Sequence, residues 1–310
     1  MITYIKSTAN GIEKIDELVP GAWINIVDPT TDEIEQVMAI GIPQDYLTNP
    51  LDLDERSRTE REDDGTTLII IRLPYFQGPK VDVPYITVPL GIILNDNTII
   101  TVGRHNNYII DEMANGRVRG LSTAKRYRFV LRILLNTATR FLHYLREINN
   151  RVDLLEDQLQ ASMKNKEVAE LLKIQKSLVY FTTALRSNQL VLDRLQRGQM
   201  FHKYPDDEDL LEDVITENQQ AIDMATTSAT ILSSMMDSFA SIISNNLNVV
   251  MKFLASMTIV LSLPMIVTSY FGMNVALPLQ TDPNAYLMII GIFVLLSLLV
   301  VWVFMKRDWF

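Results

Sequence analysis

A glycine and an uncharged amide occur together in the segment SYFGMN, Ser269 to Asn274, which lies between two long apolar runs. Asn274 offers a carbonyl oxygen without a formal charge, and Gly272 lacks the side chain that would keep neighbouring chains apart. A ring of such oxygens can accept hydrogen bonds from the water shell of a cation. Mg²⁺ suits this arrangement because it gives up its water shell reluctantly. Three residues are a small signal, so the elements that position them decide its meaning.

A stripe of small polar residues leads towards this segment at alternating steps of three and four, which place them on one helix face. Its first part is Gln220, Asp223, Thr227, Thr230, Ser234, Asp237, Ser241, Ser244 and Asn248. The same register continues through Met251, Ala255, Thr258, Ser262, Met265 and Ser269. Solvated helix faces usually carry Lys, Arg and Glu, yet no basic residue occurs between Lys203 and Lys252. In an oligomer, each Asp of the stripe would become a ring of carboxylates that favours cations. The alternative interpretation is the solvated face of an ordinary coiled-coil stalk.

Two apolar segments of about 20 residues each, 249–271 and 285–305, are long enough to cross a bilayer. Because only a short loop separates them, they predict a helical hairpin in the lipid bilayer. Lys252 begins the first segment, Lys306 and Arg307 follow the second, and the loop has no Lys or Arg. The positive-inside rule therefore places both termini in the cytoplasm and predicts a multi-pass protein of the cytoplasmic membrane.

The residues before the membrane hairpin predict an α/β domain followed by long helices. Strand-like runs occur at 22–27, 66–76, 85–94 and 98–103, and the segment DPTTDEIEQV, which begins at Asp28, marks a helix start. From Leu121 to about Gln199 the pattern predicts two long antiparallel helices with a break near Ser162. A packing seam then recurs at Ile222, Ala225, Ala229, Leu232, Met236, Phe239 and Ile243, within a stretch free of Pro and Gly from Asp206 to Leu263. One helix can therefore run from the stalk into the first span.

We accordingly predict an α+β membrane protein with seven segments. They are an α/β domain (1–120), a long-helix hairpin (121–204), a stalk helix (205–248), a first transmembrane helix (249–273), a loop (274–284), a second transmembrane helix (285–305) and a basic tail (306–310). The three histidines are scattered, cysteine is absent, and the chain has no phosphate-binding glycine loop or nucleophile motif. We therefore expect no enzymatic activity, no cofactor and no nucleic-acid partner.

Three segments resemble the CorA family of divalent-cation channels: YFGMN at the end of the first span, the terminal KRDWF, and AWINIVDPTTDEIEQV near the N-terminus. The resemblance covers nearly the whole chain and implies a homopentamer that takes up Mg²⁺, with Co²⁺ and Ni²⁺ as further candidates. It implies that Gly272, Met273 and Asn274 form the outer selectivity ring, with Asn274 as a metal-binding group. The pore wall would comprise Asp237, Ser241, Ser244, Asn248, Met251, Ala255, Thr258, Ser262, Met265 and Ser269.

Regulation by cytosolic Mg²⁺ is the second implication of the resemblance. Asp213 corresponds to a carboxylate that helps to bind regulatory Mg²⁺ between subunits of the family. The acidic stretch Asp206 to Asp213 also predicts repulsion between carboxylates unless a cation neutralises them.

One departure leaves the transported ion open. The family often has Met-Pro-Glu-Leu after the motif, whereas this chain has LPLQ, Leu277 to Gln280, and Asp282 would only partly replace the glutamate. The zinc-transporting ZntB branch also departs there, so Zn²⁺ transport is an alternative. A scaffold that is anchored in the membrane and transports nothing is a second alternative.

Overall fold

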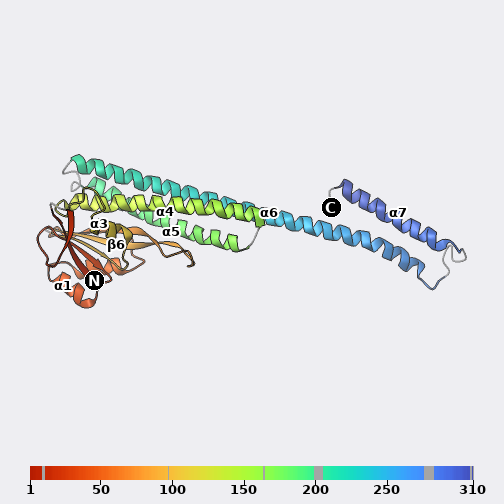
Figure 1. Cartoon of the computed structure of the whole chain (residues 1–310), viewed down its shortest axis with the longest axis horizontal. Coiled ribbons are helices and arrows are strands. Elements are labelled where there is room, and N and C mark those ends of the chain that lie inside the picture. Colours follow the sequence, from red (N-terminus) through yellow and green to blue (C-terminus); the bar gives the residue numbers. More distant parts are fainter. Residues whose placement is uncertain are drawn as a thin grey trace. The chain divides into compact units, whose positions relative to one another are not determined.

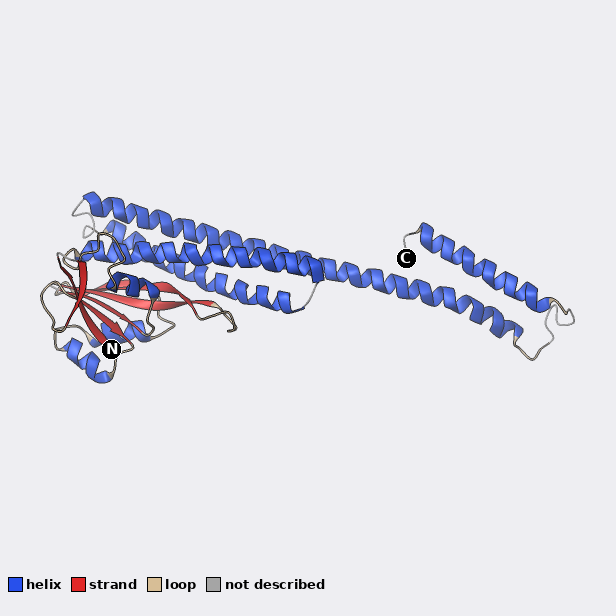
Figure 2. Cartoon of the chain, viewed as in Figure 1, coloured by secondary structure: helices blue, strands red, loops and turns tan. Residues whose placement is uncertain are grey.

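Seven strands form one sheet in the order β2-β1-β3-β7-β6-β5-β4. Figure 2 draws the sheet in red beside the helices. Its strands are β1 (Ile2–Thr8), β2 (Gly11–Ile15), β3 (Trp23–Val27), β4 (Arg58–Arg61), β5 (Thr67–Phe76), β6 (Tyr85–Asn95) and β7 (Thr98–Gly103). The β3–β7 pair is parallel and the other pairs are antiparallel. The four predicted strands are all present. The three unpredicted strands carry many polar residues and lie towards the edges of the sheet. Strands β2 and β1 lie at one edge, and β4 lies at the other.

The computed structural model describes residues 1–8, 11–96, 98–162, 165–198, 205–275, 283–307 and 309. The chain divides into two units, Met1–Ser233 and Ser234–Phe310, and the sheet belongs to the first.

The central strands are almost continuously apolar because both faces of the sheet are covered. Ile69 and Ile71 of β5 join a core with the long helices, whereas Leu68 and Ile70 face the opposite way. The second face packs against the short helices α1 (Thr31–Met38) and α2 (Gln44–Thr48), which a 3₁₀ turn, η1 (Asn49–Leu51), follows.

Helix α1 begins within the segment that the sequence predicts as a helix start, and Thr30 caps it. The Thr30 hydroxyl accepts a hydrogen bond from the Glu33 backbone N–H, and the Glu33 carboxylate accepts one from the Thr30 N–H. This reciprocal capping box satisfies two of the donors that an α-helix leaves unpaired at its start.

Helices α3 (Tyr108–Ala114), α4 (Arg126–Ser162) and α5 (Asn165–Arg197) cover the first face of the sheet. Helices α4 and α5 are the two long helices that the sequence predicts, and α4 ends at Ser162, the predicted break. Figure 1 shows them running alongside the N-terminal part of α6.

Helix α6 runs from Pro205 to Phe271 and continues through Pro264. Within the first unit, Ile222, Ala225 and Leu232 of the predicted seam are buried. In the second unit Phe239 is buried, but Ile243 is 47% exposed in the single chain.

The second unit contains the rest of α6 and helix α7 (Ala285–Lys306). Among the described residues, α6 and α7 are the two helices long and apolar enough to cross a membrane. The fold is therefore an N-terminal α/β domain, long helices and two C-terminal apolar helices, as predicted.

Candidate functional site

The polar stripe lies on an open face of α6. From Gln220 to Ser269 its members are exposed in the single chain, apart from half-buried Ser262. Met265 is 68% exposed and Met251 is 55% exposed, which is unusual for large apolar side chains in a soluble environment. This face of the helix is therefore available to lipid or to other copies of the chain.

Several hydroxyls of the stripe are oriented by their own helix. Ser241 donates to the Asp237 carbonyl at 3.0 Å, Thr258 to the Leu254 carbonyl at 2.8 Å, and Ser262 to the Ile259 carbonyl at 2.8 Å. Each hydroxyl proton is thereby donated to a carbonyl of the same helix, and the lone pairs of the hydroxyl oxygen stay available to accept hydrogen bonds. The stripe therefore offers hydrogen-bond acceptors, which a hydrated cation requires.

The opposite face of α6 within the second unit is the more buried one. Ser256 is fully buried, and Val260, Leu263 and Val267 are half-buried. Helix α7 has a matching half-buried series at Ala285, Ile289, Phe293, Ser297 and Val300. Since α7 is the other described helix of this unit, these series mark the faces that the two helices turn towards each other. Successive helical residues are about 100° apart, so Thr258 lies roughly half a turn from Ser256 and faces away from α7.

Helix α6 ends immediately before the predicted filter. The Gly272 N–H donates to the Thr268 carbonyl at 2.9 Å, and the Met273 N–H donates to the Tyr270 carbonyl at 3.3 Å. A Cβ atom at Gly272 would lie 3.1 Å from the Thr268 oxygen, so glycine suits this tight end. Asn274 is exposed, and its side chain makes no hydrogen bond to another described residue. The segment 276–282, with LPLQ and Asp282, lies outside the described residues.

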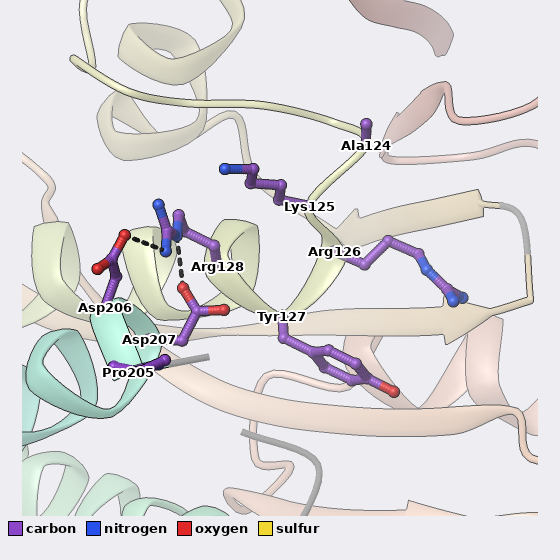
Figure 3. A pocket seen from close by; sticks show the side chains of 8 residues that line it. All are labelled: Ala124, Lys125, Arg126, Tyr127, Arg128, Pro205, Asp206 and Asp207. Atoms are coloured by element: carbon purple, nitrogen blue, oxygen red, sulfur yellow. Dashed lines mark hydrogen bonds and ion pairs between the residues drawn. The ribbon is translucent and has the colours of Figure 1, made fainter. Parts of the chain in front are cut away.

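The acidic start of α6 is partly neutralised within the chain. Figure 3 shows Arg128 of α4 pointing towards Asp206 and Asp207, across a pocket of about 410 Å³. The Arg128 Nε lies 2.5 Å from Asp207 Oδ1, and Nη2 lies 3.2 Å from Asp206 Oδ2. The hydrogen bond to Asp207 is the main cause that raises the pKa of Arg128 above its ordinary value. Arg128, which sequence reasoning missed, therefore neutralises part of the charge of these two carboxylates within one chain, whereas the repulsion expected between carboxylates of neighbouring subunits stays a prediction.

Asp213 lies two turns further along α6 and is exposed. Within the described ranges, no group of three or more His, Cys, Asp or Glu side chains is placed to hold a metal ion. One chain therefore does not assemble a regulatory site around Asp213 from these residues, and its role stays a prediction that needs a second subunit.

Comparisons with known proteins cover most or all of the chain. The family model described as CorA-like Mg²⁺ transporter protein matches residues 21–307. The chain is 31% identical over 298 residues to the cobalt/magnesium transport protein CorA of Methanocaldococcus jannaschii, which covers 93% of this chain and 90% of the relative. The complete structure of the CorA magnesium transporter from that organism superposes with a TM-score of 0.88 at 26% identity, and covers 100% of this chain and 99% of the other.

More distant structures share the fold. The full-length CmaX protein superposes with a TM-score of 0.75 at 16% identity, over 100% of this chain and 98% of the other. The cytoplasmic domain of ZntB from Vibrio parahaemolyticus superposes with a TM-score of 0.58 at 12% identity, over 77% of this chain and 97% of the other. At these identities the likeness concerns the fold alone.

Proposed function

The chain belongs to the CorA family, and from this premise we propose that it carries divalent cations across the cytoplasmic membrane through a pore formed by five copies. The family is one of membrane transporters rather than enzymes. We propose Mg²⁺ as the principal ion, with Co²⁺ and Ni²⁺ as further substrates, and place both termini in the cytoplasm.

The observation that carries this proposal is the position of the polar stripe. Its part from Met251 to Ser269 faces away from α7, so α7 leaves that part free to meet the same residues of other copies around an axis. Polar groups facing lipid would be costly, whereas the same groups facing a water-filled pore are not. The stripe therefore supports a pore wall rather than a lipid-facing surface.

The stripe also supports a mechanism for passage of a hydrated ion. Oxygens of Thr258 and Ser262 accept hydrogen bonds from the water shell of the ion, so the ion need not lose that shell. One ring of Asn274 side-chain oxygens, one from each copy, selects the ion at the outer mouth. Gly272 has no side chain, so neighbouring chains can approach closely and the ring can be narrow. Rings of Met251 interrupt the polar wall and can close a narrow pore by dewetting.

Gating by cytosolic Mg²⁺ is the regulatory part of the proposal. Asp213 is exposed and unpaired among the described residues, so it is free to bind Mg²⁺ together with ligands from a neighbouring subunit. Mg²⁺ bound between subunits stabilises the symmetric closed state, because it binds that state more tightly than the open one.

Zinc transport of the ZntB type is the second candidate. The LPLQ loop supports it, because the loop departs from the Met-Pro-Glu-Leu pattern of many family members, as the ZntB branch also does. A proton-coupled mechanism, in contrast to a channel, predicts a dependence of the flux on a pH gradient.

The decisive experiment is cation flux into liposomes that contain the purified full-length protein. Mg²⁺, Co²⁺, Ni²⁺ and Zn²⁺ are each measured with and without a pH gradient. We expect Asn274→Ala to abolish flux while the oligomer stays assembled. Asn245→Ala is the matched control, because Asn245 is an exposed amide of α6 outside the stripe. Wild-type flux through Asn274→Ala would contradict the assigned filter, and absence of all flux through the wild-type protein would favour the scaffold alternative.

A further inference from the structure

Three buried residues in the first part of α6 make polar contacts with the α4–α5 hairpin. Asp207 pairs with Arg128, Asn218 bonds to α5, and the Ser228 hydroxyl lies 2.7 Å from the Asn149 side-chain oxygen of α4. The α6 partners in these contacts are all buried, with exposed fractions of 5%, 3% and 8%. They recur over about six turns of the helix.

Asn218 occupies the middle of this series, in an otherwise apolar contact. Its Nδ2 donates to the Gln189 Oε1 at 2.8 Å and to the Leu185 carbonyl at 3.3 Å. Val214 and Ala221, one turn away on either side, are fully buried. If the contact were wholly apolar, α6 could slide by one turn along the hairpin, because each apolar side chain would then pack against another apolar side chain. The buried Asn218 amide opposes such a shift, because its N–H donors would lose their partners on α5.

A buried asparagine in the apolar seam of a coiled coil fixes the register of its helices in this way. Asn218 also lies opposite the polar stripe. At about 100° per residue it is roughly half a turn from Gln220 and Thr227. The contact that holds α6 against the hairpin therefore also determines which way the stripe faces.

We propose that Asn218 is a positioning residue that sets the register and rotation of α6 against the hairpin and so presents the polar stripe away from it. Because α6 is one helix as far as Phe271, this rotation is passed along the same helix that carries the proposed pore wall. The link to transport rests on the proposed function, whereas the register itself does not.

Disulfide crosslinking measures the register directly, because the chain has no cysteine of its own. Asn149→Cys is combined with Ser228→Cys, the native contact, or with Met224→Cys or Leu232→Cys, one turn away on either side. All pairs are made in the full-length protein. With Asn218 present we expect the native pair to dominate.

The test variant is Asn218→Leu with Gln189→Leu. It removes both side-chain amides, so neither amide of the pair is left buried without its hydrogen-bond partner. We expect the ratio of native to shifted crosslinks to fall about tenfold, which corresponds to about 1.4 kcal/mol of register preference. Gln219→Leu is the control, since the Gln219 amide is exposed and bonds to Asp223 of its own helix. It should leave the ratio unchanged.

An exchange variant, Asn218→Gln with Gln189→Asn, keeps one amide on each helix and should retain the native crosslink. This separates positioning from a general effect on folding. An unchanged ratio in the double leucine variant would overturn the proposal, as would a shifted register in the exchange variant. Flux is measured on the same samples. Loss of flux with the native register retained would concern the pore, not the role of Asn218.

Discussion

Replacement of Asn188 tests how helix α5 completes the sheet. Strand β4 pairs with β5 only as far as Ile70, so the backbone of Arg72 has no strand on that side. The buried Asn188 side chain takes the place of the missing strand. Its Oδ1 accepts from the Arg72 N–H and its Nδ2 donates to the Arg72 carbonyl, both at 2.9 Å. The Ser57 hydroxyl also donates to the Asn188 Oδ1, at 2.8 Å.

The cost of Asn188→Ala follows from the groups that it leaves unpaired. The Arg72 N–H and carbonyl each lose a partner, and an unpaired buried group costs about 1 to 3 kcal/mol. Because Arg72 is half-buried, water can relieve part of this cost, and we take the lower end for each group. We therefore expect a loss of about 2 to 3 kcal/mol, which is roughly a 30- to 150-fold change in an opening equilibrium.

Hydrogen exchange of peptides spanning β5, in the full-length protein in detergent, measures this opening. Exchange in β5 should accelerate by that factor in Asn188→Ala. Asn136→Ala is the matched control, because the Asn136 Nδ2 donates only within its own helix, to the Arg132 carbonyl at 2.7 Å. It should change exchange in β5 by less than about threefold. The idea that Asn188 substitutes for a strand is refuted if Asn188→Ala and Asn136→Ala exchange alike.

Three further predictions concern the gate, the regulatory carboxylate and the pH dependence of stability. Met251→Ser should raise the basal leak of Mg²⁺ from loaded liposomes, because a polar ring cannot dewet the pore; an unchanged leak would place the constriction elsewhere. Asp213→Ala and Asp213→Lys should change the internal Mg²⁺ concentration needed for closure without changing the ion preference at Asn274, and unaltered closure curves in both variants would remove Asp213 from the sensor. Burial, assisted by Glu147, raises the pKa of Tyr85 to about 12 from an ordinary value near 10. The folded state therefore holds the phenol proton longer, so this stability is complete below pH 10 and is lost as the pH rises towards 12. Thermal melts of Tyr85→Phe should accordingly fall less steeply over that range than those of the wild type, and equal slopes would count against the assignment.

Features that depend only on residues close together in the sequence could be predicted from the sequence. The helix start at Thr30, the strand β5 and the apolar helix α7 all follow from patterns that span one element. The stripe on α6 is of the same kind, because spacing of three and four defines one helix face without reference to any other element. Strands β1, β2 and β4 were missed because they are rich in polar residues, so their pairing with neighbouring strands decides their structure.

Only the tertiary structure decided which distant residues meet. Arg128 and Asp207 are 79 positions apart, and Asn188 and Arg72 are 116 apart. Spacing places Asn218 four residues before Ile222, in line with the predicted packing seam, but it does not tell that α5 covers this position and leaves the neighbouring Gln219 exposed. Burial against α5 gives Asn218 its two hydrogen bonds, and this burial depends on how α4, α5 and α6 pack. Spacing along the chain determines the faces of a helix, but the packing of other helices determines which of those faces is covered.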